Sequence, residues 1–380
     1  MPQKFNVQGG RADPADAPHA SSSCVRRSLL RSRGDRGHAR QSTGATLIHS
    51  DFHGEYGAQI GLLPRRWLII ALLLSLVVVD ALMDHAQLTI LPNGACAIFL
   101  AAGIGLVAIQ HHVRGSAARR HKALRACCED VLLFAAVSLL GAVASYAIAA
   151  DTHGWIDPQL AHMDMRIGFD WPAWYREVAA HRILQVAGTI AYASIFATPV
   201  LLLGVFAADR QRAEARHFIA SFWLAAVISL ALFHFLPTLG PLDYLWRGPI
   251  PYVPTSGLYQ VDLIPLLREH GLHHVDLGAL RGLVGPPSFH AASAMLYIAA
   301  AWRVRRFRLP ITALNIAMLL SIPVEGTHYA TDVLGGIAVA LLSHALITQL
   351  ARSRFVSRPI GAKILKPKQS PIAEGHHVTP

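Results

Sequence analysis

The chain has 380 residues, of which 53% are hydrophobic and only 15% are charged, and its mean hydropathy is positive. A soluble domain normally carries about a quarter charged residues, so this composition excludes an ordinary soluble protein. The net charge of +11 is of a size also found in nucleic-acid-binding proteins. The positions of the basic residues, described below, argue against nucleic acid as a partner.

The N-terminal segment, residues 1–63, is rich in Arg, Ser, Gly and His and has almost no aliphatic run. This composition predicts a disordered basic tail. The first apolar stretch begins near residue 66, so no cleavable signal peptide is expected. The four cysteines show neither metal-ligand nor disulfide spacing, and we interpret them as small apolar side chains.

Several apolar stretches are long enough to cross a bilayer, which takes about 20 mostly apolar residues. They lie at residues 66–84, 89–110, 129–150, 183–207, 217–236, 288–302, 309–324 and 328–350. The pattern predicts an all-α, polytopic membrane protein, a helical bundle with about eight transmembrane helices.

Basic residues follow alternate loops between these stretches. They occur in the N-terminal tail, in "HHVRGSAARRHKALR", "DRQRAEAR" and "RVRRFR", and in the C-terminal tail at 351–380. The positive-inside rule therefore predicts a multi-pass protein of the cell membrane with both termini in the cytoplasm. The charge is thus an orientation signal, and we expect no nucleic-acid partner.

Two polar motifs interrupt the apolar second half of the chain: "GPPSFHAAS" at 285–293 and "EGTHYATDVLGG" at 325–336. His290 and His328 each begin an apolar stretch, and by the topology above both ends face outward. The stretch from Ser288 is short, which predicts a start recessed below the outer surface. We expect Ser288 and Thr327 to be N-caps. Free amides and positive helix dipoles at such caps predict an anion site, with phosphate as the usual occupant.

The spacing within "HYATD" adds chemistry to this anion site. His328 and Asp332 are four residues apart, so a helix would place them on one face. The carboxylate can fix the tautomer of the imidazole and leave its other nitrogen free to attack. His290, from another helix, can then protonate a leaving oxygen. The alternative is that these ionisable residues only cap helices or extend toward the membrane surface.

"PSFHAAS" followed by "GTHYATDVLGG" resembles the type 2 phosphatidic acid phosphatase superfamily. The inositol phosphorylceramide synthase-like (inositolphosphotransferase) branch is the most similar, and "DPQLAHMDMRIGFDWPAW" and "FLPTLGP" also resemble loops of that branch. The resemblance implies a six-helix phosphatase-like core at 128–350. Residues 64–127 would then add two transmembrane helices and a basic loop.

The same resemblance implies a lipid phosphatase or phosphotransferase that works through a phosphohistidine and needs neither metal nor cofactor. His328 would be the nucleophile, Asp332 its partner, His290 the acid and Ser288 a phosphate contact. The superfamily's Ser-Arg before the nucleophile is here Ser321-Ile322. No lysine lies on the outer side, so we nominate Arg281 as the cationic phosphate ligand; Arg247 and Arg268 are also available.

Three functions remain open at this level. The first is an enzyme at the outer face of the membrane that acts on a phosphoester, phosphodiester or pyrophosphate lipid. The second is a transporter with a His/Asp proton relay, which predicts ionisable groups at mid-span. The third is a metal-dependent membrane hydrolase that uses His290, His328, Asp332 and Glu325, and sensitivity to a chelator would identify it.

Overall fold

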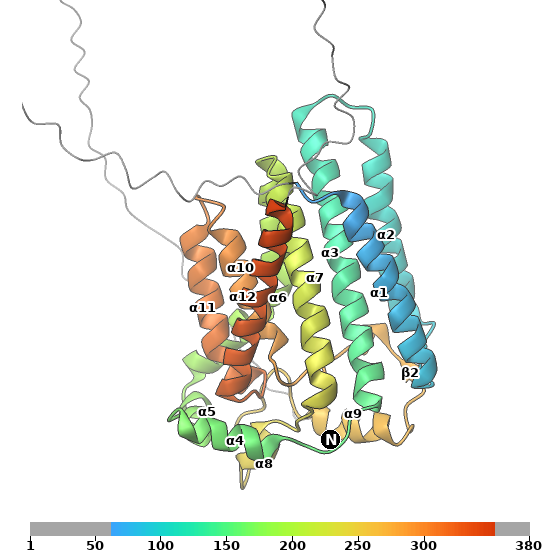
Figure 1. Ribbon diagram of the computed structural model, residues 1–380. Helices are drawn as coiled ribbons and strands as arrows, with labels where there is room; N and C mark the ends of the chain where they lie inside the picture. Colours follow the sequence, from blue (N-terminus) through green and yellow to red (C-terminus); the bar gives the residue numbers. More distant parts are fainter. Residues whose placement is uncertain (1–61, 354–380) are drawn as a thin grey trace, which may run out of the picture. The chain divides into compact units, whose positions relative to one another are not determined.

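The computed structural model describes residues 62–353, which form a bundle that is almost entirely helical (Figure 1). Within these residues, seven helices are long and apolar enough to cross a membrane. They are α1 (Arg65–His85), α2 (Gly94–His112), α3 (Arg119–Ala150), α6 (Arg182–Ala208), α7 (Arg212–Phe235), α11 (Arg308–Glu325) and α12 (Ala330–Arg352). A further apolar helix, α10 (Phe289–Ala301), is shorter. The predicted polytopic helical membrane bundle is confirmed. Nearly all of the two predicted tails lies outside the described residues.

The second apolar stretch begins later than predicted. Residues 89–90 form a short strand, β1 (Thr89–Ile90), which pairs in parallel with β2 (His274–Val275). Pro92 cannot donate a backbone hydrogen bond, which favours a break before the helix. The Asn93 side chain then accepts hydrogen bonds from the amides of residues 95 and 96, at 3.0 and 3.3 Å, and caps α2.

Several short elements gather at one end of the bundle, the lower end in Figure 1. They are α4 (Asp157–Arg166), α5 (Trp171–Ala180), α8 (Pro241–Leu245), α9 (Tyr259–Arg268) and the 3₁₀ turn η1 (Leu277–Ala279). The basic loops between α2 and α3, between α6 and α7, and between α10 and α11 lie at the opposite, upper end (Figure 1). The two ends therefore differ in charge as the alternation of basic loops predicted.

Helix α10 lies among the other long helices, because it packs against α6, α7, α11 and α12. Its residues 291–294 are small and fully buried. A Cβ on Gly336 of α12 would lie 2.1 Å from the Ser288 carbonyl oxygen, so only glycine permits this approach. The helix has 13 residues and a length of roughly 20 Å, shorter than a bilayer's hydrocarbon core.

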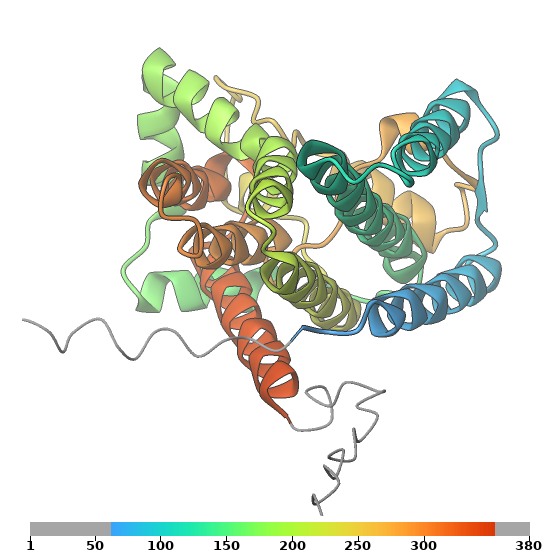
Figure 2. The ribbon, with the colours of Figure 1, turned by 90° about the horizontal axis from the view of Figure 1, so that it is seen from above.

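Helices α1 and α2 stand at one side of the bundle. Each packs against α3, and Figure 2 shows them as the blue and cyan helices spread to either side of it. Helix α2 has no buried residue, and α1 has only three. Their apolar surfaces are therefore available to lipid along most of their length.

Candidate active site

His328 and Asp332 meet at the start of α12. His328 Nδ1 lies 3.4 Å from Asp332 Oδ2, and the two residues are only 4% and 2% exposed. The same carboxylate oxygen accepts a hydrogen bond from the Tyr329 backbone N–H at 3.2 Å. The amide thus holds the carboxylate beside one imidazole nitrogen, which leaves His328 Nε2 for another partner.

The predicted cap of this helix is wrong. Tyr329, not Thr327, is the N-cap residue, and α12 begins at Ala330. Thr327 lies before the helix with a backbone φ of 52°, in the left-handed region. His328 therefore precedes the helix, and the carboxylate of Asp332 reaches back to it from the first turn.

The first amides of α12 are bound by a carboxylate from α4. Asp164 accepts hydrogen bonds from the N–H groups of Ala330 and Thr331, at 2.8 and 2.9 Å. Asp164 is almost fully buried. The anion site predicted at the start of α12 is therefore occupied by the protein's own side chain, since a carboxylate satisfies the helix terminus as a phosphate would.

A second carboxylate of α4, Asp157, binds the residue next to His328. It accepts hydrogen bonds from the hydroxyl of Tyr329 at 3.0 Å, from the hydroxyl of Thr238, and from the amides of Leu239 and Gly240 at 3.1 and 3.0 Å. Three of these donors contact Oδ1 and the Leu239 amide contacts Oδ2, so Asp157 ties Tyr329 to the loop at 238–240. The sequence reasoning did not select either aspartate. Their spacing of seven, which places both on one face of α4, was the available signal.

The start of α10 matches the prediction. Ser288 is the N-cap, its Oγ accepts from the Ala291 amide at 3.4 Å, and its own amide donates to the Asp332 carbonyl oxygen at 3.0 Å. Within residues 62–353, the amides of Phe289 and His290 have no hydrogen-bond acceptor. Helix α10 therefore offers the free N–H groups that α12 does not.

His290 is held by an aromatic residue of α6. Its ring stacks on Tyr192 with centroids 4.1 Å apart, and its Nδ1 lies 3.3 Å from the Tyr192 hydroxyl. A Cβ on Gly326 would lie 2.8 Å from His328 Cδ2 and 3.1 Å from Tyr192 Cε2. Tyr192 therefore lies close to both imidazoles. It follows Arg182 by ten residues, so the pair is about 15 Å along α6 from its first residue.

Comparison with protein-family models gave a match around these residues. Residues 158–346 match the PAP2 superfamily. The matched segment runs from α4 to α12 and contains both histidines, Asp332 and Asp164. Curated proteins and solved structures gave no match. Together with the membrane-type helices, the PAP2 superfamily match indicates an enzyme of membrane phosphatase type.

Arg281 lies inside the segment that matches the PAP2 superfamily, but it is not in direct contact with the histidines. Its guanidinium lies over the Tyr259 ring, 5.7 Å from the centroid, and its amide donates to the Tyr146 hydroxyl at 2.9 Å. Among the described residues no carboxylate pairs with the exposed Arg281 side chain.

Glu325, at the end of α11, anchors a loop next to His328. It accepts hydrogen bonds from the Tyr252 hydroxyl at 2.7 Å and from the hydroxyl and amide of Thr255 at 2.5 and 3.1 Å. Burial, and then this hydrogen bond, raises the pKa of Tyr252 to about 12, so the phenol remains a donor. Glu325 is therefore engaged in holding the loop at 252–256. Among residues 62–353, no three His, Cys, Asp or Glu side chains form a group suited to a metal ion.

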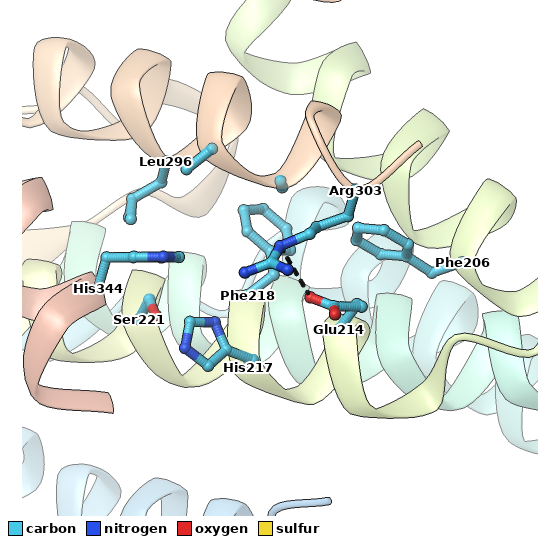
Figure 3. A pocket seen from close by; sticks show the side chains of 10 residues that line it. Phe206, Glu214, His217, Phe218, Ser221, Leu296, Arg303 and His344 are labelled. Carbon is cyan, nitrogen blue, oxygen red and sulfur yellow. Dashed lines mark ion pairs between the residues drawn. The ribbon is translucent and has the colours of Figure 1, made fainter. Parts of the chain in front are cut away.

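A second polar cluster lies far from these residues. In Figure 3, His217, Ser221, His344 and Arg303 line a small pocket, with Glu214 paired to Arg303 at 3.6 Å. His344 follows His328 by sixteen residues, a distance of roughly 24 Å along α12. The cluster is therefore not part of the candidate active site, although it contains two histidines.

Removing the Asp164 carboxylate should lower both the stability of the protein and its rate of turnover. Asp164→Ala leaves two amides of α12 without an acceptor, and loss of an N-cap costs on the order of 1 kcal/mol of stability. We expect a lower melting temperature and slower turnover, because the residues that follow His328 lose their fixed position. Thermal unfolding in detergent and a phosphate-release assay measure the two effects.

Asp170→Ala is the matched control, since Asp170 caps α5 through the Ala173 amide at 3.0 Å and has no contact with α12. It should leave turnover unchanged. Wild-type turnover in Asp164→Ala would contradict a positioning role for the α4 carboxylates.

Proposed function

We propose that this protein is a metal-independent lipid phosphatase or phosphotransferase of the PAP2 superfamily that forms a phosphohistidine on His328. The observation that carries the proposal is the junction of α10 and α12. It brings together a carboxylate-bound imidazole, a second imidazole stacked on Tyr192, and free helix amides. These are the nucleophile, the proton donor and the anion contacts that phosphoryl transfer requires.

The proposed reaction has two steps. His328 Nε2 attacks phosphorus, an N–P bond forms, and the P–O bond to the leaving group breaks while His290 supplies the proton to the leaving oxygen. Water or an alcohol then attacks phosphorus and gives its proton to His290, and the N–P bond breaks. Asp332 stabilises the positive charge that His328 gains, and its Oδ1 is buried without a hydrogen-bond partner in the described structure.

Two sets of groups would bind the negative charge of the substrate. The free amides of Phe289 and His290 at the α10 terminus, beside the Ser288 cap, face the phosphate. Arg281 is the proposed cationic ligand, because its side chain is exposed and carries no ion pair with another described residue. The motifs resemble those of the inositolphosphotransferase branch. This resemblance favours a substrate and an acceptor of the kind that those enzymes use.

A substrate panel tests the proposal. Purified protein is incubated with phospholipids, prenyl pyrophosphates and an aryl phosphate, and both free phosphate and headgroup transfer are followed. We expect turnover of at least one lipid that persists in excess chelator. Loss of activity with chelator would favour the metal-dependent hydrolase, and no turnover of any phosphorylated lipid would favour the transporter.

His290→Ala, assayed on the same panel, tests the role of the second imidazole. A general acid matters most when the leaving group is poor, so lipid turnover should fall far more than aryl phosphate turnover. Equal losses on the two substrates would indicate that His290 only binds phosphate.

Orientation is part of the proposal: both termini are cytoplasmic, and the α10–α12 junction faces outward in the cell membrane. In a variant without native cysteines, we expect His153→Cys and His273→Cys to react with an impermeant maleimide on intact cells. Ala118→Cys and Arg306→Cys, at the basic end, should react only after permeabilisation. All four positions are exposed, so accessibility is decided by the membrane alone. Labelling of residue 306 in intact cells would reverse the orientation.

A further inference from the structure

An open pocket of about 320 Å³ lies between α1, α2 and α3 at the basic end of the bundle. Its walls carry three arginines and one glutamate, and α3 forms its floor. It is lined by Arg65, Val107, Gln110, His111, Arg114, Arg125 and Glu129. The pocket lies outside the segment that matches the PAP2 superfamily. The C-terminal end of α2, which lines it, is at the opposite end of the bundle from the start of α12 (Figure 1).

The charges of this pocket are not balanced by the protein. The Glu129 carboxylate is already paired with Arg65 at 3.1 Å and with Arg212, outside the pocket, at 3.0 Å. Arg114 and Arg125 make no side-chain hydrogen bond or ion pair with any other residue of the described part. Two free guanidinium groups thus face a space large enough for a small ligand. Guanidinium groups match the paired oxygens of a phosphate.

An apolar stripe leads from this pocket into the membrane. His111 and Val107 line the pocket, and Ile104 and Leu100 continue the same face of α2 at helical spacing. Val107, Ile104 and Leu100 are 52%, 68% and 67% exposed, and no helix of the described part covers them. A ligand with an anionic head and an acyl chain matches both features.

We propose that this pocket binds the headgroup of an anionic glycerophospholipid from the leaflet next to the basic loops, with an acyl chain along the α2 stripe. Basic pockets between transmembrane helices at the cytoplasmic side are suited to such headgroups. The lipid fills the space between α1 and α2, both of which pack on α3. This site is separate from the candidate active site and does not depend on the proposed enzymatic function.

Lipid association with the full-length protein tests the proposal. Spin-labelled phosphatidylglycerol and phosphatidylcholine are compared for immobilisation by wild type and by Arg114→Gln/Arg125→Gln in reconstituted vesicles at physiological salt. We expect wild type to prefer phosphatidylglycerol. The variant should lose about a hundredfold of that preference, since it removes two arginines and each charge-assisted hydrogen bond contributes on the order of tenfold. Val107→Trp, which fills the pocket and keeps its charges, should show the same loss.

Arg119→Gln/Arg120→Gln is the matched control, because it removes the same charge from the start of α3 without touching the pocket lining. It should change the preference less than twofold. Equal losses in the two double variants would reduce the effect to general surface attraction and overturn the proposal. Wild-type preference in both pocket variants, or displacement of the bound lipid by inorganic phosphate alone, would also overturn it.

Discussion

His328→Ala is expected to abolish turnover of every lipid substrate and all transfer of labelled phosphate to the protein. The alanine has no nitrogen to attack phosphorus, so neither half of the reaction can begin. The adduct on wild-type protein should be labile to acid and stable to base, as a phosphoramidate is. Quench-flow with phosphorus-labelled substrate, followed by peptide mapping, locates the label.

His162→Ala is the matched control for this experiment. His162 is an exposed histidine on α4, at the same end of the molecule. It should carry no label in wild type or in His328→Ala. Label on any residue other than His328, or full activity of His328→Ala, would overturn the proposed mechanism.

Asp332→Asn is expected to slow formation of the phosphoenzyme while substrate binding is retained. His328 Nδ1 and the Tyr329 amide share Oδ2 of Asp332, so an asparagine whose NH₂ group turns to His328 gives up the Tyr329 contact. The helix start should persist, because Asp164 still binds the first two amides of α12. The asparagine NH₂ group, directed at His328 Nδ1, would favour the tautomer with a proton on Nε2, which cannot attack. The equivalent change in the serine protease triad lowers kcat by about 10⁴-fold, and a loss of that order is expected here.

The measurement is the rate of phosphoenzyme formation in a single turnover, together with substrate affinity. Asp170→Asn provides the comparison, since it makes the same chemical change at an exposed cap that does not contact His328. An Asp332→Asn protein that forms the adduct at the wild-type rate would remove the carboxylate from the mechanism.

The positions of the long helices could be predicted from the sequence because each is a local property. A run of apolar residues predicts a helix wherever lipid replaces water, since unpaired backbone groups are costly in hydrocarbon. The Ser288 cap was also predictable, because capping needs only the few residues that follow. The cap at Thr327 was predicted wrongly by the same reasoning, since Asp164 stabilises the helix start from another element.

The spacing of His328 and Asp332 likewise predicted that the two side chains would meet, because four residues span one turn of helix. Their actual contact depends on the turn before α12, where the Tyr329 amide binds the carboxylate. Pattern alone did not predict this turn. It also assigned free amides to both helix starts, whereas the structure leaves them free only at α10.

The surroundings of the two histidines were decided by tertiary structure. Tyr192 lies 98 residues before His290, and Asp157 lies 172 residues before Tyr329. A tyrosine in an apolar helix and an aspartate in a loop have many equally plausible partners in the sequence. Which of them meet depends on how α4 and α6 pack against the starts of α10 and α12. The sequence by itself therefore determined the long apolar helices and the candidate site residues, because these depend on neighbouring residues. Only the packing of distant elements decided which groups hold the histidines in place.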